Sequence, residues 1–393
     1  FKKGCYVGQE NTARIKLKNK LSKRLLPINV VNGELTEGES IYYSENEIGK
    51  VLIKNNDGTL ILIAASEVIT DKTISLMKDI TGSNPTIIIT KERYSLINNI
   101  KSKNNYYSIS NDKLDSELCH LLSYKVNISK KTAKNLNVFR EDNQATESII
   151  SLLKYGKIVP SFLMCNFSNE SSENIFDKSK ENNLFVLNLI DLEMFEQQKK
   201  EVSLMVEANV PLKSNKNVKV LGFRPTDGSS DHFAFVFNNG RSVKEPYVRI
   251  HSQCITGDLF HSLKCDCGSQ LNEAINFLSD KNGIILYMSQ EGRDIGFLNK
   301  MRAYSYQEKG LNTIDANNAI GFDTDQRDFE YASSILKSLK LFSVRLISNN
   351  PDKKRVLEKD GIKVIEVLPL KVPFSQEAND YINIKKKLMG HSL

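Results

Sequence analysis

Residues 249–270 have the sequence R-I-H-S-Q-C-I-T-G-D-L-F-H-S-L-K-C-D-C-G-S-Q and contain three of the six cysteines of the chain. Cys254 is followed after ten residues by Cys265, and a single residue separates Cys265 from Cys267. Cysteines crowded in this way do not resemble a disulfide framework spread over a secreted domain. Because thiolates are soft ligands that suit zinc, the spacing predicts a metal site.

The number of protein ligands decides what kind of zinc site this is. A structural site is closed by a fourth protein ligand, whereas a catalytic site leaves the fourth position to water. Zinc lowers the pKa of bound water to near neutrality, which provides the hydroxide that hydrolysis of a ring carbon requires. Three clustered cysteines favour the open site. The alternatives are closure by His251, His261 or Cys165, or three buried cysteines that bind nothing.

The sequence on the C-terminal side of the cysteines alternates between strand and helix patterns. Strands are expected at V-K-V-L-G-F and H-F-A-F-V-F after Val218, and then at G-I-I-L-Y-M, V-R-L-I and K-V-I-E-V. Helices are expected at 271–278, 297–309, 327–339 and after Pro351. This order predicts an α/β fold for the second half of the chain.

Two short segments in this half are suited to binding phosphate. S-Q-E-G-R-D-I-G (289–296) is a predicted turn from strand to helix, where backbone N–H groups and Arg293 could bind an anion. S-N-N-P-D-K (348–353) places Ser348 and Lys353 at the carboxyl end of a predicted strand, where open α/β sheets bind ligands. The alternatives are an ordinary turn with a surface arginine and a plain Asn-Pro turn.

A third segment, G-F-D-T-D-Q-R-D-F (321–329), places Asp325 two residues before Arg327. A carboxylate can act as a general base, and a guanidinium can hold or attack a phosphoryl group. The alternative is an aspartate that caps a helix and forms a surface salt bridge.

The N-terminal half has its own α/β pattern. T-L-I-L-I-A-A from Thr59, I-T-D-K-T-I-S-L-M-K-D-I and T-I-I-I-T predict a strand, a helix and a strand. Residues 1–56 are rich in turn residues and short β-like runs, which predicts a small β unit. The polar segment 166–183 is either a long loop or a linker.

Taken in order, R-I-H-S-Q-C, L-K-C-D-C-G, Q-E-G-R, N-K-M-R-A-Y, D-A-N, G-F-D-T-D-Q-R-D-F and S-N-N-P resemble the successive signatures of GTP cyclohydrolase II. The resemblance extends from about residue 218 to the C-terminal G-H-S-L. It implies a zinc-dependent enzyme that releases pyrophosphate from GTP, opens the imidazole ring and removes its carbon as formate. The product would be 2,5-diamino-6-ribosylamino-4(3H)-pyrimidinone 5′-phosphate, formed in the first step of riboflavin biosynthesis.

Carried over residue by residue, the resemblance implies three kinds of site residue. Cys254, Cys265 and Cys267 would bind one Zn²⁺ per subunit. Asp325 would accept a proton, Arg327 would attack the α-phosphate, and Tyr304 would lie near the ring-opening chemistry. The GTP site would be lined by Arg249, Ile250, His251, Ser252, Gln253, Gln270, Glu291, Gly292, Arg293, Thr313, Ser348 and Lys353. Mg²⁺ would assist at the triphosphate, because its hard charge suits phosphate oxygens.

Three residues depart from the family pattern. Gln253 stands where the family usually has Glu, Ser348 where it usually has Thr, and Asp294 where Gly or Asn is common. The first change removes a charge beside a zinc ligand, and the second keeps a hydroxyl. We expect activity to survive, with the affinity for the nucleotide the property most affected.

Two further resemblances concern the upstream sequence and define the expected domains as 1–56, 57–205 and 206–393. Residues 57–205 resemble a degenerate dihydroxybutanone-phosphate synthase that lacks the acidic D-E-D-R-E-N-E-G-D cluster and the R-x-G-H-T-E-A segment, which implies a scaffold. K-G-C-Y-V-G-Q-E-N-T-A-R, with Cys5 as the signature cysteine, resembles the C-terminal part of folate-binding, glycine-cleavage-T-like proteins. The chain would then be a fusion or a splice of two reading frames.

The composition of the chain limits its expected localisation and binding partners. The chain is 40% hydrophobic, has no apolar run of the roughly 20 residues that cross a bilayer, and has no leader, so we expect a cytoplasmic protein and no membrane partner. It starts at Phe1, as expected for a piece of a longer reading frame. The net charge is +7, but aromatic residues do not alternate with the basic side chains as they do in a groove that binds single strands, which argues against a nucleic-acid partner. The family resemblance suggests a homodimer. The rival functions are a catalytically silent nucleotide-binding scaffold and an iron–sulfur assembly factor.

Overall fold

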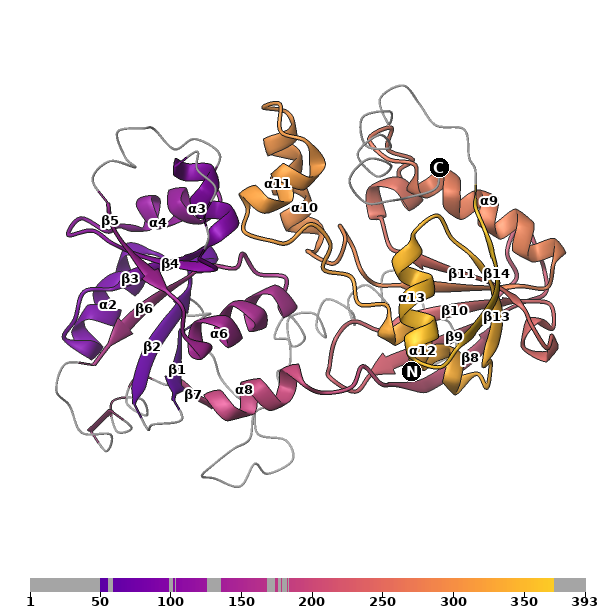
Figure 1. The fold of residues 1–393 in the computed structure, drawn as a ribbon, viewed down its shortest axis with the longest axis horizontal. Coiled ribbons are helices and arrows are strands. Elements are labelled where there is room, and N and C mark those ends of the chain that lie inside the picture. Colours follow the sequence, from indigo (N-terminus) through magenta and orange to yellow (C-terminus); the bar gives the residue numbers. More distant parts are fainter. Residues whose placement is uncertain are drawn as a thin grey trace, which may run out of the picture. The chain divides into compact units, whose positions relative to one another are not determined.

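The computed structural model describes residues 50–55, 59–98, 102, 104–125, 136–167, 174–175, 178, 182 and 184–370. These residues form two seven-stranded sheets with helices packed against them (Figure 1). The predicted α/β fold is therefore confirmed. The K-G-C-Y-V-G-Q-E-N-T-A-R segment and the C-terminal G-H-S-L lie outside the described residues.

The first sheet has the strand order β5-β4-β3-β6-β2-β1-β7. Its strands are β1 (Lys50–Lys54), β2 (Leu60–Ala65), β3 (Thr86–Thr90), β4 (Tyr106–Ser110), β5 (Asn137–Glu141), β6 (Phe162–Asn166) and β7 (Phe185–Asn188). All pairs are antiparallel except β1–β7. The predicted strand T-L-I-L-I-A-A forms β2, whose six residues are all buried. Since β1 pairs with β2, this sheet begins before the domain limit expected at residue 57.

Helices pack against both faces of the first sheet. They are α2 (Asp71–Thr81), α3 (Lys91–Asn98), α4 (Ser116–Ser123), α6 (Gln144–Tyr155) and α8 (Leu189–Glu196). Neighbouring residues of a strand point to opposite faces, so Leu62 joins a core with α2 and α4, while Ile63 joins a core with α6 and α8. The helix α2 starts at a Thr70 capping box and ends at Gly82, whose left-handed conformation suits glycine.

The strand β7 pairs in parallel with β1. The polar segment 166–183 therefore connects β6 and β7, two strands of one sheet, and is not a linker between the two sheets.

The second sheet has the strand order β14-β13-β11-β12-β10-β9-β8. Its strands are β8 (Val202–Asn209), β9 (Val218–Pro225), β10 (His232–Phe237), β11 (Tyr247–Ser252), β12 (Ile284–Met288), β13 (Ser343–Ile347) and β14 (Lys363–Leu368). The strands β12, β11, β13 and β14 are paired in parallel, and the other pairs are antiparallel. The carboxyl ends of β11, β12 and β13 therefore meet at one edge. The domain limit expected at 205/206 falls inside β8.

Five helices follow in this half: α9 (Cys267–Asp280), α10 (Phe297–Gln307), α11 (Thr313–Ala319), α12 (Glu330–Ser338) and α13 (Pro351–Lys359). Four of them match the predicted helices, although α12 begins three residues after the expected position 327. The helix α11 was not predicted, because its T-I-D-A-N-N-A sequence contains few strong helix formers. One core packs the second sheet against α12 and α13, and another packs it against α9. None of the described helices is both long and apolar enough to cross a bilayer.

Candidate active site

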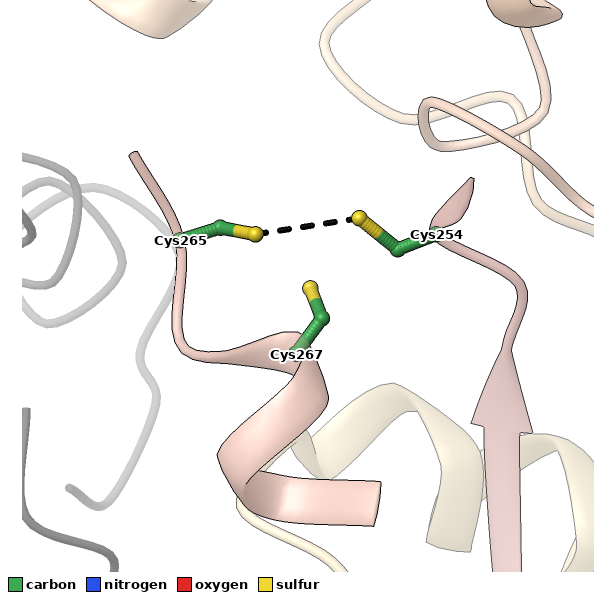
Figure 2. Close-up of side chains that lie close together, drawn as sticks. All are labelled: Cys254, Cys265 and Cys267. Carbon is green, nitrogen blue, oxygen red and sulfur yellow. Dashed lines mark hydrogen bonds between the residues drawn. The ribbon is translucent and has the colours of Figure 1, made fainter. Parts of the chain in front are cut away.

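The three clustered cysteines lie at the carboxyl end of β11. Cys254 is the second residue after this strand, and Cys267 is the first residue of α9. Their three sulfur atoms lie within 4.8 Å of one another, with 3.7 Å between those of Cys254 and Cys265, and Figure 2 shows the side chains pointing toward a common centre. Thiolates bound at about 2.3 Å to one tetrahedral zinc ion are about 3.8 Å apart. The spacing therefore fits a single metal ion.

The backbone of the loop after Cys254 is closely fitted to the sulfurs. Gly257 lies in a single π-helical turn, Ile255–Leu259. A Cβ at this glycine would lie 2.9 Å from Cys265 Sγ and 3.1 Å from Cys254 Sγ. Any side chain at this position would displace the sulfurs, so the turn is shaped around the three thiols.

Among the described residues, no histidine, cysteine or carboxylate joins the three sulfurs as a fourth ligand. His251 Nε2 is instead 3.2 Å from Asp258 Oδ1. Cys165 lies in β6 of the first sheet, and its sulfur contacts the carbonyl oxygen of Ser83. His261 is exposed and is not part of the group. The geometry favours the open, catalytic kind of site over the closed, structural kind.

Lys300 of α10 is buried against the cysteine loop. Its Nζ lies 3.1 Å from Cys254 Sγ, 2.7 Å from Thr256 Oγ1 and 2.9 Å from Glu291 Oε1. Burial opposes the charge of this lysine, but the opposite charges of Cys254 and Glu291 and the nearby Tyr304 outweigh burial and raise the pKa of Lys300. Lys300 therefore places a positive charge beside the Cys254 sulfur.

The thiols themselves share their protons unequally. The Cys265 and Cys267 thiols donate to the Cys254 sulfur and, together with Lys300, hold the pKa of Cys254 well below its ordinary value. The same contact with Cys254 raises the pKa of Cys265 to about 11. A metal ion bound by the three sulfurs would displace the protons that the thiols carry.

Asp258 stabilises the cysteine loop through hydrogen bonds to its carboxylate. Its Oδ2 accepts hydrogen bonds from the backbone N of Cys254 at 2.9 Å and from the Tyr287 hydroxyl at 2.8 Å. The imidazole of His251 lies against the same carboxylate, and burial lowers the pKa of this histidine. A neutral His251 buried in this network supports the loop that carries the first cysteine.

The S-Q-E-G-R turn after β12 joins the cysteine loop to the loop before α12. Glu291 Oε2 accepts a hydrogen bond from the backbone N of Ile255 at 2.6 Å. On the other side, Gln290 Nε2 donates to the carbonyl of Asp328 at 2.6 Å. The turn therefore links the predicted metal site with the predicted acid–base loop.

The backbone of this turn has an unusual conformation. Gly292, Arg293 and Asp294 have φ values of 64°, 60° and 72°, all in the left-handed region. Glycine and asparagine enter this region most readily, and aspartate tolerates it. The conformation explains why Gly or Asn suits the position that Asp294 occupies here. Arg293 Nη1 donates to the carbonyl of Thr324 at 3.2 Å.

Asp325 and Arg327 form a two-bond ion pair in the loop before α12. Arg327 Nε is 2.8 Å from Asp325 Oδ1, and Nη2 is 2.5 Å from Oδ2. Burial raises the pKa of Asp325, but Arg327 outweighs it and lowers the pKa below its ordinary value. The N-cap of α12 is Phe329, so Asp325 is not the helix cap that the alternative interpretation required.

Two buried cations contact β11 and β13: Arg249 is the third residue of β11, and Lys353 is the third residue of α13. Lys353 is buried, and its Nζ donates to the carbonyl of Ile250 at 2.7 Å. Arg249 is also buried: Nη2 donates to Gln270 Oε1 at 2.6 Å, while Nε has no hydrogen-bond partner among the described residues. Burial lowers the pKa of Arg249 to about 10. A buried guanidinium with an unused donor is suited to bind an anion.

The other predicted site residues lie in the same loops. Ser252 Oγ donates to Gln290 Oε1 at 3.4 Å, and the Ser348 hydroxyl bonds the backbone of Asn350. The ring centre of Tyr304 lies 5.8 Å from Lys300 Nζ. Gln253 directly precedes the first cysteine, and Thr313 begins α11, with its side chain outside the described atoms.

Sequence reasoning missed three polar residues of the site. Lys300, Thr256 and Asp258 contact the cysteines or their loop. Lysines and aspartates of this kind usually lie on a solvated surface. The available signal was the N-K-M-R-A-Y motif, whose lysine is four residues before Tyr304 and thus on the same face of a helix.

Comparison with known proteins agrees with this geometry. A profile of the family described as GTP cyclohydrolase II matches residues 203–369. A GTP cyclohydrolase-2 of Vibrio vulnificus (strain CMCP6) is 43% identical over 194 residues, which cover 49% of this chain and 98% of that protein. This chain belongs to the GTP cyclohydrolase II family. The predicted resemblance and enzyme class are thereby confirmed.

Other relatives of the family match over different lengths. A GTP cyclohydrolase-2 of Haemophilus influenzae (strain PittEE) is 42% identical over 193 residues, covering 49% of this chain and 89% of that protein. The riboflavin biosynthesis protein RibBA of Endomicrobium trichonymphae is 34% identical over 255 residues, covering 63% of each. This alignment is longer than residues 203–393, so it includes part of the chain before residue 203.

Among solved structures, the two-domain 3,4-dihydroxy-2-butanone 4-phosphate synthase RibBX from A. baumannii aligns with 82% of this chain and 96% of its own chain, with 14% sequence identity and a TM-score of 0.30.

Proposed function

We propose that residues 206–393 catalyse the zinc-dependent hydrolysis of GTP to 2,5-diamino-6-ribosylamino-4(3H)-pyrimidinone 5′-phosphate, formate and pyrophosphate, the first step of riboflavin biosynthesis. Family membership supports action on GTP. The observation that carries the proposal is the open group of three sulfurs, which the S-Q-E-G-R turn joins to the Asp325–Arg327 loop.

Cys254, Cys265 and Cys267 would hold one zinc ion. When bound, zinc provides a Lewis acid that lowers the pKa of water to near neutrality, which suits attack on carbon 8 of guanine. Lys300 offsets the net negative charge that three thiolates and one Zn²⁺ carry together. Tyr304, on the same helix and with its ring centre 5.8 Å from Lys300 Nζ, would position the ring that opens.

The triphosphate would bind at the sheet edge where β11, β12 and β13 end. Arg249, Arg293 and Lys353 would provide the positive charge, and Mg²⁺ would add further charge that suits phosphate oxygens. The Arg249 Nε that has no partner among the described residues would gain a phosphate oxygen as its acceptor. Ser348, on the loop between β13 and the helix α13 that carries Lys353, would contribute a hydroxyl.

Arg327 and Asp325 would release pyrophosphate. Attack by a guanidine nitrogen of Arg327 forms a P–N bond at the α-phosphorus and breaks the P–O bond to the leaving pyrophosphate. A guanidinium must lose a proton to become nucleophilic, and Asp325 already accepts hydrogen bonds from Nε and Nη2 of this arginine. Hydrolysis of the P–N bond returns the free arginine and the 5′-phosphate. The pair is thus arranged for proton transfer between its two members.

The test is to incubate the purified chain with GTP, Zn²⁺ and Mg²⁺ and to measure formate, pyrophosphate and the diaminopyrimidine. We expect the three products in equal amounts. Zinc bound at one equivalent together with GTP binding and no formate would instead establish the silent nucleotide-binding scaffold. Sedimentation of the same sample tests the proposed homodimer.

A further inference from the structure

Lys157 lies in the loop after α6, in the part of the chain that carries the first sheet. It contacts Asp294, the residue that follows the S-Q-E-G-R turn. Lys157 Nζ lies 2.6 Å from Asp294 Oδ1, and both side chains are largely buried. The carbonyl of Lys157 accepts a hydrogen bond from Asn299 Nδ2 at 2.8 Å. Asn299 is fully buried and also donates to the carbonyl of Ile295 at 2.9 Å. One residue of this loop therefore holds both the turn and the start of α10.

Two glycines bring the surfaces into close contact. A Cβ at Gly296 would lie 3.0 Å from the Cβ of Lys157. A Cβ at Gly321 would lie 3.0 Å from Pro160 Cγ and 3.1 Å from Thr90 Oγ1. Both glycines have positive φ values, so the backbone and the fit each disfavour a side chain. Because these two positions have no side chains, segments 289–296 and 321–329 lie directly against residues of the first-sheet region.

Buried and partly buried polar contacts continue along α10 and α11. Arg93 of α3 is buried and donates Nη1 to the carbonyl of Ala319 at 2.7 Å and to the hydroxyl of Tyr306. Arg302 Nη2 is 2.8 Å from Glu67 Oε1. The helix α10, which carries Lys300 and Tyr304, is therefore held in place by residues without a proposed catalytic role.

We propose that Lys157 is a positioning residue for nucleotide binding, and that it acts by neutralising Asp294, the residue after Arg293 in the left-handed turn. The inference rests on the proposed function, in which Arg293 binds a phosphate. The physical reason is the charge of Asp294, which directly follows Arg293 in the chain. Without Lys157, this carboxylate would repel a triphosphate and compete for its cation. The residues around the first sheet would then serve the GTP site through one ion pair.

The test compares GTP turnover in Lys157→Met, Asp294→Asn and the double variant. Removing the lysine alone should raise KM for GTP about tenfold and leave kcat within twofold, because an unpaired carboxylate opposes binding and not ring opening. Asp294→Asn should stay within twofold of the wild type. The double variant should return to within threefold of the wild-type KM, since no charge remains to be neutralised. Lys157→Arg should preserve KM.

Lys125→Met is the matched control. It removes the same charge from the same part of the chain, but its ion pair, with Glu117, stays within that part. This variant should keep the wild-type KM, and thermal unfolding should confirm that every variant is folded.

An unchanged KM in Lys157→Met would overturn the proposal. So would a double variant as impaired as Lys157→Met, because the loss would then come from packing and not from charge. The binding of a non-hydrolysable GTP analogue separates this proposal from the proposed function. If the wild type binds the analogue but does not turn over GTP, the proposed function fails. The same pattern of changes in Kd across the variants would still establish the role of Lys157.

Discussion

The two seven-stranded sheets of this chain differ in the direction of their strands, and this difference decides where chemistry can gather. In the second sheet, β11, β12 and β13 are parallel neighbours, so the loops that follow them share one edge. The cysteine loop, the S-Q-E-G-R turn and the S-N-N-P segment are these loops. In the first sheet only β1 and β7 are parallel, so consecutive strands mostly end at opposite edges.

The comparison teaches that sheet topology, and not composition, assembles the site. The first sheet region also contains cysteines and carboxylates, but within the described ranges the group of three sulfurs after β11 is the one cluster suited to a metal ion. Cys119 of α4 and Cys165 of β6 are buried in one hydrophobic core and belong to no such group. Parallel strands bring residues far apart in sequence to a common ligand-binding edge.

The largest effect should come from removing a sulfur on the second sheet. Cys265→Ser should lose zinc and lower ring opening by a factor of about 1,000 or more, because two thiolates do not hold the metal or its water. Cys165→Ala, at a cysteine of the first sheet, should keep one zinc per chain. Metal analysis and formate release measure both. Ring opening retained in Cys265→Ser would show that the metal assignment is wrong.

A smaller loss is expected from the cation beside the sulfurs. Lys300→Met should weaken zinc binding and turnover about 10- to 100-fold, the range typical of residues that support metal ligands. Competition with a chelator gives the zinc affinity. Lys264→Met is the control, because this exposed lysine also lies over Tyr304, at 4.7 Å, without contacting a sulfur. Equal losses in the two variants would contradict the role given to Lys300.

The acid sensitivity of the two sheets should also differ. Burial lowers the pKa of His232 from 6.5 to about 4, and its Nδ1 accepts a hydrogen bond from the backbone N of Ser289. As the pH falls, His232 therefore binds a proton in the unfolded chain before it does so in the folded chain. The free energy of unfolding is full above pH 6.5 and decreases as the pH falls toward 4. At pH 5 the loss is about 2 kcal/mol.

Urea unfolding at pH 7.5 and pH 5 measures this loss. His232→Gln keeps an acceptor without the titration and should reduce the difference between the two pH values. His120→Gln, at the more exposed histidine of α4, should reduce it less. If His232→Gln loses as much stability as the wild type on acidification, His232 is not the sensitive group.

The smallest effect should come from restoring a family residue at the sheet edge. Ser348→Thr keeps the hydroxyl that bonds the backbone of Asn350, so KM for GTP should change by no more than about threefold. Ser348→Ala leaves the buried N–H of Asn350 without its partner and should cost about 1 kcal/mol of stability. A Ser348→Thr variant with a tenfold change in KM would show that the departure at this position matters for binding.

Much of the second half could be predicted from sequence because its signals are local. The cysteine spacing is set by one loop, and the buried run I-I-L-Y-M shows β12 directly. The turn residues around Arg293 follow a strand and precede a helix, as expected. Such features depend on neighbours within a few residues.

What sequence reasoning missed depends on contacts between distant residues. Lys300 contacts Cys254, which is 46 positions away in the sequence, and Lys157 contacts Asp294, which is more than a hundred positions away. The parallel pairing of β7 with β1 likewise has no local signature. Such contacts follow from the packing of whole elements, which hydrophobic periodicity does not specify.

The central claim is that the three cysteines hold a zinc ion with one position open to water. X-ray absorption at the zinc edge of the purified chain tests it most directly. We predict three sulfur neighbours at about 2.3 Å and one oxygen neighbour at about 2.0 Å that GTP binding perturbs. Four protein ligands, whether a fourth sulfur or a histidine nitrogen, would show a closed structural site and contradict the account.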